Sequence, residues 1–165
     1  MSTLITPLQE QDWPAVADIY LEGITTGHAT FRKEIPDWPD WDKNHIQSCR
    51  FVAKVENETV GWAALSPVSS REVYRGVAEV SIYIKQNNRG QRIGENLLKH
   101  LVTASELAGF WTLQAVIFPE NVASIKIHEK AGFRVVGRRE RIGKMDNVWR
   151  DTLLLERRSN IVGLD

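Results

Sequence analysis

The residues best placed to do chemistry lie where a predicted strand, residues 79–84, runs through a short polar turn into a predicted helix from Gly94. Apolar residues alternate in the first part, as in a strand, and recur at helical spacing in the second. In such a turn, backbone N–H groups converge on one point, where the helix dipole also favours negative charge. Arg89 and Arg92 add positive charges that suit phosphate oxygens. The stretch predicts a phosphate-binding turn, with a plain tight turn as the alternative.

A second stretch downstream gives the first a more specific meaning. It runs Asn121-Val-Ala-Ser-Ile-Lys-Ile-His-Glu-Lys-Ala-Gly-Phe133, and the first runs Arg89-Gly-Gln-Arg-Ile-Gly94. In this order, with one helix and one strand between them, they resemble the two cofactor-binding motifs of the Gcn5-related N-acetyltransferase (GNAT) superfamily. The family's first motif runs Arg/Gln-x-x-Gly-x-Gly/Ala and wraps the pyrophosphate of acetyl-coenzyme A (acetyl-CoA). Its second runs Asn-x-x-Ala/Ser-x-x-x-Tyr-x-x-x-Gly-Phe.

The resemblance implies that acetyl-CoA is the co-substrate. Asn121 is also a good N-cap for the helix that follows it, and the two roles are compatible. No histidine shows metal-ligand spacing with acidic residues or cysteine, so no metal is expected. Cofactor binding is expected at Ile82, Tyr83, Ile84, Arg89, Gly90, Gln91, Arg92, Ile93, Gly94, Glu95, Asn121 and Ser124.

Amide formation from a thioester needs a base for the amine, a polarised carbonyl and a proton for the departing thiolate. Glu79 is the candidate base, because a partly desolvated carboxylate can accept the amine's proton directly or through water. The N–H group of Ile82 or Tyr83 can polarise the carbonyl if the neighbouring strand leaves it unpaired. His128 can protonate the thiolate, since imidazole titrates near pH ~6.5. The alternatives are a solvated glutamate and a structural histidine.

Two positions depart from the family's motifs. His128 stands where most of the superfamily has tyrosine, and Arg92 stands where the first motif has glycine. If the backbone at Arg92 needs a positive φ, a residue other than glycine costs roughly 1–2 kcal/mol there. If only the N–H direction matters, Arg92 is free to contact phosphate, so the departure bears on cofactor affinity rather than on the fold.

Several shorter segments resemble one branch of the superfamily, the phosphinothricin and methionine sulfoximine N-acetyltransferases. They are Ile19-Tyr20, Thr30-Phe31-Arg32, Tyr74-Arg75, Ile127-His128-Glu129 and Trp149-Arg-Asp151, and the resemblance covers about residues 3–156. It implies acetylation of the α-amine of a small glutamate-like amino acid, such as phosphinothricin or methionine sulfoximine or sulfone. It also implies Glu79 as the base and a homodimer.

Substrate binding is expected at Phe31, Arg32, Tyr74 and Arg75. A zwitterionic substrate needs a cation for its carboxylate, and an arginine can form a bidentate pair with it. Solvated arginines are the alternative. Three other functions stay open: a peptide or protein N-terminal acetyltransferase, a polyamine acetyltransferase, and a CoA-binding module without turnover. The sequence does not give the physiological substrate.

Composition sets the remaining limits. The 165 residues are 42% hydrophobic and 25% charged, which fits one domain over residues 1–165. Lysine and arginine number 21, and so do aspartate and glutamate, so net charge favours neither nucleic acid nor an anionic membrane as partner. Cys49 is expected to be a packed thiol rather than a catalytic one. No apolar run of ~20 residues or signal peptide is apparent, so a cytoplasmic protein is expected.

The hydrophobic pattern predicts a mixed α/β (α+β) domain, and the family's order β-α-α-β-β-β-α-β-α-β-β matches it. Strand 112–117 is nearly all apolar and is expected to be buried on both faces. The polar tail, residues 157–165, is expected to fray. Strands are expected at 4–8, 51–55, 59–65, 79–84, 112–117, 133–137 and 149–155, and helices at 12–24, from 38 to near 50, 94–109 and 122–131.

Overall fold

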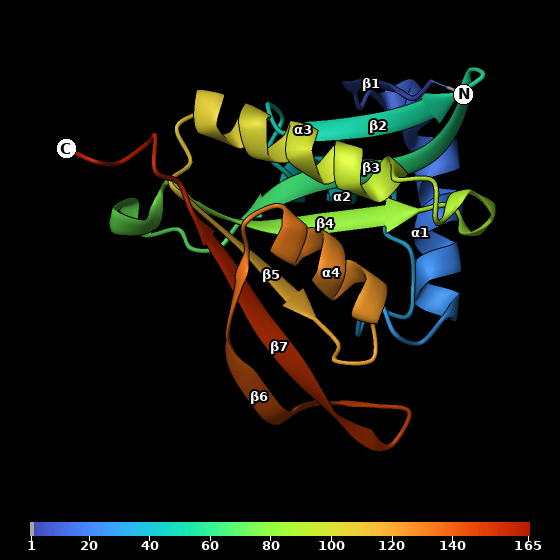
Figure 1. Cartoon of the computed structure of the whole chain (residues 1–165). Coiled ribbons are helices and arrows are strands. Elements are labelled where there is room, and N and C mark those ends of the chain that lie inside the picture. Colours follow the sequence, from blue (N-terminus) through green and yellow to red (C-terminus); the bar gives the residue numbers. More distant parts are fainter. Residues whose placement is uncertain (1) are drawn as a thin grey trace.

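A single seven-stranded sheet in the order β1-β2-β3-β4-β5-β7-β6 organises the computed structural model, which describes residues 2–165 (Figure 1). Neighbouring strands are antiparallel except for β4 and β5, which are parallel. This confirms the predicted mixed, mostly antiparallel architecture. The strands are β1 (Leu4–Pro7), β2 (Arg50–Val55), β3 (Glu58–Pro67), β4 (Val77–Ile84), β5 (Thr112–Ile117), β6 (Arg134–Met145) and β7 (Val148–Arg158).

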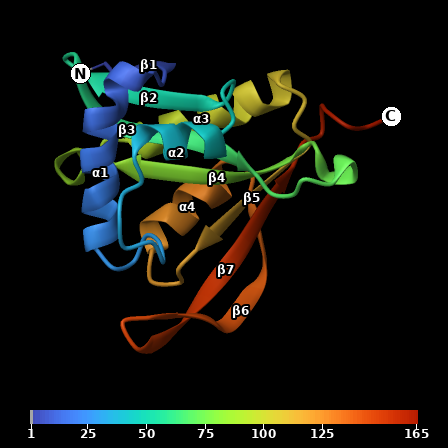
Figure 2. The same cartoon turned by 180° about the vertical axis from the view of Figure 1, so that it is seen from behind.

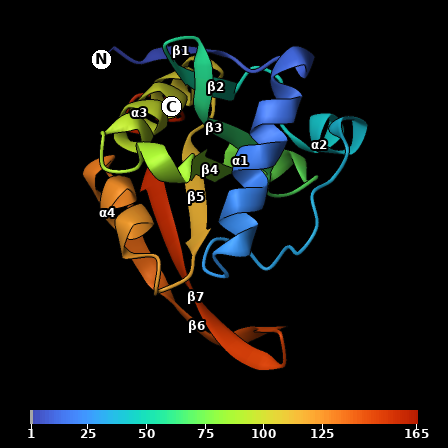
Figure 3. The same ribbon diagram turned by 90° about the vertical axis from the view of Figure 1, so that its right-hand side faces the viewer.

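Four α-helices cover the two faces of the sheet. The pair α1 (Trp13–Thr25) and α2 (Trp38–Asn44) lies on one face, and α3 (Ile93–Leu107) and α4 (Val122–Lys130) lie on the other (Figures 2 and 3). Among the described residues, no helix is both long and apolar enough to cross a membrane.

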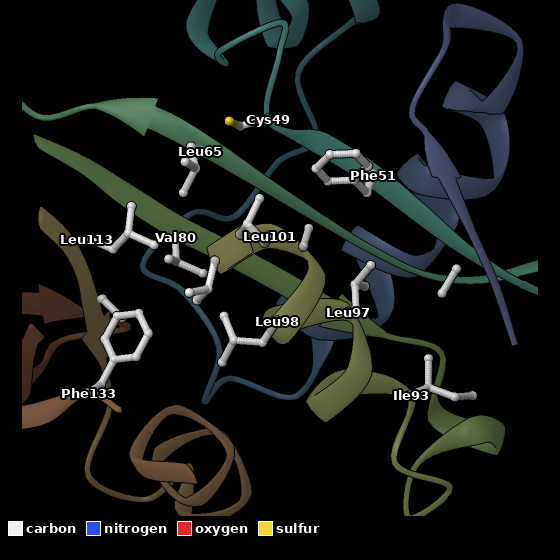
Figure 4. Packing of buried hydrophobic residues seen from close by; sticks show 14 of the residues in the cluster. Cys49, Phe51, Leu65, Val80, Ile93, Leu97, Leu98, Leu101, Leu113 and Phe133 are labelled. Atoms are coloured by element: carbon white, nitrogen blue, oxygen red, sulfur yellow. The ribbon is translucent and has the colours of Figure 1, made fainter. Parts of the chain in front are cut away.

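Each face has its own core, because side chains alternate across a strand. Under α3, leucines of the helix pack on aliphatic residues of the strands, with Leu98 and Leu101 near Val80 and Leu65 (Figure 4). Cys49 is fully buried in this core, as expected. Under α1 and α2 the core is aromatic and is built around Trp41 and Trp62.

The second helix is shorter than the sequence suggests. It ends at Asn44 rather than near residue 50, because the backbone at His45 is already extended (φ −121°, ψ 145°). Arg50 instead begins β2, and its buried side chain forms an ion pair with Asp42 and lies over the Trp41 ring.

Strand β5 is not buried on both faces as predicted. Leu113, Ala115 and Ile117 are buried, whereas Val116 is 36% exposed. The apolar side chain of Val116 lies instead in the wall of a cavity that begins where β5 leaves its neighbour β4.

The end of the chain is also more ordered than predicted. Strand β6 continues to Met145 instead of ending at residue 137, so β6 and β7 form a long hairpin that extends from the body (Figure 1). After β7, Arg158 donates hydrogen bonds to the carbonyls of Val162 and Gly163, and Ser159 is buried. These bonds hold the segment that was expected to fray.

Candidate active site

A cavity opens where the two parallel strands β4 and β5 diverge. β4 and β5 pair only at Val77–Thr112, Ala78–Leu113 and Glu79–Gln114, after which they diverge (Figure 1). The cavity between them has a volume of about 350 Å³. Its walls come from β4, β5, α4, Tyr20 on α1, Thr152 on β7 and the α1–α2 loop (residues 26–37).

The hydrogen-bond alternation of β4 decides which backbone N–H group points into this opening. The N–H of Lys85 donates to Val60 in β3, and the carbonyl of Val77 accepts from Val68, so odd-numbered residues of β4 bond to β3. In an antiparallel pair this direction alternates along the strand. The N–H of Ile82 therefore points toward the side that β5 has left, while that of Tyr83 points toward β3. Of the two predicted oxyanion donors, the geometry favours Ile82.

Glu79 lies at the last paired position before the strands diverge. Its Oε1 accepts a hydrogen bond of 2.9 Å from Gln114 Nε2, and the half-buried side chain lines the cavity. Residues two apart share a face of a strand, so Glu79 faces the same side as Tyr83, the side of α1. Its carboxylate is thus held in place without an ion pair and can accept a proton from a group in the cavity.

His128 lines the same cavity and is 2% exposed. Its Nδ1 lies 2.7 Å from the carbonyl oxygen of Ser124. A carbonyl oxygen only accepts, so Nδ1 carries the proton and Nε2 of the neutral ring is an acceptor. Burial lowers the pKa of His128, and the bond to Ser124 only partly offsets that effect. The resting imidazole is therefore neutral and accepts a proton before it can donate one from Nε2.

The orphaned polar atoms in this wall belong to His128 and Thr152. Within residues 2–165, His128 Nε2 and Thr152 Oγ1 are buried without a hydrogen-bond partner, and both residues line the cavity. Sequence reasoning missed Thr152, because one threonine among the apolar residues of a strand gives no signal.

The turn before α3 has the geometry of an anion cradle. Gly90 and Arg92 have positive φ angles of 78° and 63°, and α3 begins without a side-chain cap. Within α3, Asn96 N–H bonds to the Arg92 carbonyl, while the three preceding N–H groups belong to the unpaired first turn. Arg89 is exposed beside them. Arg92 thus has the positive φ for which a backbone cost of roughly 1–2 kcal/mol was expected in a residue other than glycine.

The other predicted residues of the first motif support this turn. Gly94 packs closely against two isoleucines, since a Cβ there would lie 3.3 Å from the side chain of Ile127 and 3.4 Å from that of Ile84. The carboxylate of Glu95 forms ion pairs with Lys99 and Lys130, so only its backbone is free to face a phosphate. Ile93 is buried, and Gln91 is exposed.

Asn121 is the N-cap that its sequence position predicted. Its Oδ1 accepts from Ser124 N–H at 3.3 Å, and its Nδ2 donates to the His28 carbonyl at 3.5 Å. Asn121 and Ser124 both line the cavity. Their contact with a cofactor stays a prediction.

The predicted substrate residues fall in two places. Phe31 lines the cavity and packs edge-on against Phe118. Arg32 is exposed and does not line the cavity, but it lies near Tyr20, which does. Burial raises the pKa of the Tyr20 phenol, and the Arg32 guanidinium partly offsets this rise.

Tyr74 and Arg75 lie beyond the far end of β4, in and after a 3-10 turn (Glu72–Tyr74). Arg75 faces Glu72 at 3.6 Å and lies over the Trp111 ring. Neither residue lines the cavity, so a substrate contact from them stays a prediction. Among residues 2–165, no cluster of three or more His, Cys, Asp or Glu side chains is arranged to hold a metal ion.

Comparison with known proteins identifies the fold and the chemistry. Residues 13–133 match the family model described as "Acetyltransferase (GNAT) family". The chain belongs to the GNAT family. This confirms the resemblance drawn from its two motifs. The chain is an N-acetyltransferase, and acetyl-CoA is its co-substrate.

Two curated relatives of the GNAT chain have named substrates. It is 30% identical over 152 residues to phosphinothricin N-acetyltransferase of Streptomyces viridochromogenes, over 89% of this chain and 82% of the relative. It is 25% identical over 162 residues to the L-methionine sulfoximine/L-methionine sulfone acetyltransferase of Pseudomonas aeruginosa, over 94% of each.

Solved structures agree with the GNAT fold. A phosphinothricin acetyltransferase from Sinorhizobium meliloti in complex with acetyl-CoA has a TM-score of 0.89 and 26% identity, over 100% of this chain and 92% of that one. A ribosomal-protein-alanine N-acetyltransferase from Brucella melitensis has a TM-score of 0.87 and 29% identity, over 94% and 99%.

Proposed function

We propose that this GNAT enzyme acetylates the α-amine of a small glutamate-like amino acid, such as phosphinothricin or methionine sulfoximine or sulfone. The observation that carries the proposal is the cavity where β4 and β5 part, with the Glu79 carboxylate facing the side of α1. The names of the two curated relatives support this substrate class. Acetyl-CoA is abundant in the cytoplasm, and we propose that the enzyme acts there.

The geometry supports a direct attack in a ternary complex. The phosphates of acetyl-CoA bind the turn of residues 89–95, and the thioester lies between the diverging strands. Glu79 takes the proton of the ammonium group, and the amine nitrogen attacks the thioester carbon. Ile82 N–H donates to the oxyanion that forms. The C–S bond then breaks, and the thiolate receives a proton.

The tautomer of His128 sets the order of its proton transfers. Nε2 of the neutral ring first accepts a proton that the amine nitrogen loses as the new C–N bond forms. The imidazolium so formed then passes that proton to the thiolate sulfur. Because burial lowers the pKa of His128, the imidazolium gives up its proton more readily than an exposed one would, which suits the second step.

In this proposal an arginine binds the substrate carboxylate. Within one chain, Arg32 is the predicted cation near the cavity wall, because it follows Phe31 and acts on the Tyr20 phenol. Arg75 contributes only if a second copy of the chain brings it to the site.

We also propose that the chain is a homodimer. The β6–β7 hairpin extends from the body and carries exposed apolar side chains, and such a surface suits burial against another chain. The residues concerned are Val135, Val136, Ile142, Val148 and Trp149.

The experiment that tests the function is thiol release from acetyl-CoA with a panel of amines. The panel holds phosphinothricin, methionine sulfoximine, methionine sulfone, the common amino acids, spermidine and a short peptide that begins with alanine. Saturation by the glutamate-like compounds alone supports the proposal. Turnover of the peptide would instead favour a protein N-terminal acetyltransferase, the function in the name of the Brucella structure. No turnover with any amine would favour a CoA-binding module.

A further inference from the structure

Arg150 in β7 ties together three segments that are far apart in the sequence. Its Nη1 donates to the Gly27 carbonyl at 2.9 Å, and its Nη2 lies 3.2 Å from His28 Nδ1. The same nitrogen lies 3.4 Å from a carboxylate oxygen of Glu120, and the guanidinium is 4.2 Å from the centre of the Phe118 ring. The side chain is 13% exposed. The guanidinium of Arg150 is therefore fixed by its contacts and is not a solvated surface charge.

The segments that Arg150 joins form one side of the cavity. The α1–α2 loop supplies Ala29, Thr30 and Phe31 to the wall, directly after the residues that Arg150 binds. The turn between β5 and α4 supplies Phe118 to the same wall. These two segments lie beside each other at the open ends of the strands (Figure 3).

Two further contacts beside Arg150 join the α1–α2 loop to the turn between β5 and α4. Asn121 donates to the His28 carbonyl, and Phe31 packs on Phe118. With the bridge that Arg150 makes between His28 and Glu120, the loop is joined to the turn at three neighbouring places. The loop itself has no helix or strand from residue 26 to residue 37. Its position therefore depends on side-chain bonds rather than on a backbone ladder.

We propose that Arg150 is a positioning residue that fixes the α1–α2 loop and thereby sets the affinity for the amine substrate. This inference rests on the proposed function only in assigning this wall to the amine. We expect a smaller effect on acetyl-CoA affinity, because the turn of residues 89–95 proposed to bind its phosphates has no contact with Arg150.

Steady-state kinetics test the proposal with Arg150→Gln, Arg150→Lys and a matched control, Arg139→Gln. Arg139 is exposed on the same hairpin and makes no side-chain hydrogen bond or ion pair within residues 2–165. We expect Arg150→Gln to raise the amine KM about 10-fold or more, as for loss of a charge-assisted bond, with the acetyl-CoA KM changed less than about twofold. Arg150→Lys keeps the charge but loses the planar guanidinium that donates in several directions at once. We therefore expect its amine KM to lie between those of the unaltered protein and Arg150→Gln. Equal changes in both KM values would overturn the proposal.

Limited proteolysis tests the same inference without any substrate. Arg32 and Lys33 are trypsin sites inside the α1–α2 loop. We expect faster cleavage there in Arg150→Gln, partial protection in Arg150→Lys and unchanged cleavage in Arg139→Gln, with circular dichroism confirming that each variant is folded. Unchanged cleavage in folded Arg150→Gln would refute the positioning role. If cleavage accelerates but none of the amines turns over, the positioning role stands and the proposed substrate class fails.

Discussion

At Arg92 a single residue combines backbone strain with a useful charge. Its φ of 63° lies in the region that favours glycine, yet its side chain adds a cation beside the unpaired N–H groups of α3. The strain is local, so it lowers stability without disturbing the fold. We propose that this cation helps the turn to bind the phosphates of acetyl-CoA.

Two substitutions at Arg92 separate these effects. Arg92→Gly removes strain and charge, whereas Arg92→Ala removes the charge alone. We expect both to raise the acetyl-CoA KM several-fold, and only Arg92→Gly to raise the free energy of unfolding, by about 1 kcal/mol. Urea unfolding and kinetics measure the two quantities. An unchanged acetyl-CoA KM in both variants would remove Arg92 from phosphate binding.

For Glu79 the prediction concerns pH dependence. Glu79→Gln keeps an acceptor for Gln114 but cannot take a proton, so we expect kcat/KM at pH 7 to fall about 10²–10⁴-fold. The difference in kcat/KM between Glu79→Gln and the unaltered protein should become smaller toward pH 9, because more of the amine is then already deprotonated. Rate profiles of the two proteins from pH 6 to 9 make the comparison. Parallel profiles would show that another group is the base.

Among the helices, α4 buries a histidine in its neutral state. The folded-state pKa of His128 is lowered, so below about pH 6.5 the unfolded chain binds a proton that the folded chain does not. The free energy of unfolding should therefore fall as pH drops from about 7 to 5. Burial also lowers the pKa of His45, which adds to the same slope.

Urea unfolding at several pH values measures this slope. His128→Asn retains a donor for the Ser124 carbonyl and does not titrate, so we expect a shallower decline below pH 7 than in the unaltered protein. His100→Gln is the control, because His100 is exposed. An identical slope in His128→Asn would mean that His128 is protonated as easily in the folded state as in the unfolded one.

The spacing of hydrophobic residues in the sequence predicted most helices and strands of the fold, but not where the irregular ones end. The spacing of leucines in α3 and the glycine after α4 predicted those helices well, because both signals are local. The early end of α2 goes with a tertiary contact that periodicity does not reveal, the packing of the buried Arg50 side chain over the Trp41 ring. The outer half of β6 is exposed and rich in arginine, so it lacks the alternation of apolar and polar residues that would predict a strand.

The candidate site was predictable where family motifs carry it and not where tertiary contacts do. Residue type, residue order and the family resemblance predicted Glu79, His128 and the turn of residues 89–95, and the structure places Glu79 and His128 in one cavity wall, while their roles stay predictions. The contacts of Arg150 join segments more than a hundred residues apart, and in a sequence a lone arginine looks solvated.

At the scale of the whole molecule, the proposed homodimer gives a prediction about size. Trp149 is 56% exposed on the hairpin, and Trp149→Glu should place a charge in the interface and yield monomers. Leu107→Glu is a matched control on α3, where the leucine is 86% exposed. Light scattering after gel filtration gives the masses. A monomeric unaltered protein, or equal dissociation of both variants, would contradict the proposed interface.

The divergence of β4 and β5 also affects the stiffness of the sheet. Four strands lie before the gap and three after it, and backbone pairing joins the two groups through only three residue pairs at one end. Beyond that end, α3 and α4 bridge the groups by packing, which is less directional than hydrogen bonding. We therefore expect an acyl donor that binds in this gap to connect the two groups of strands. Part of its binding free energy would then go into stiffening the sheet, and this stiffening would be lost when the product is released.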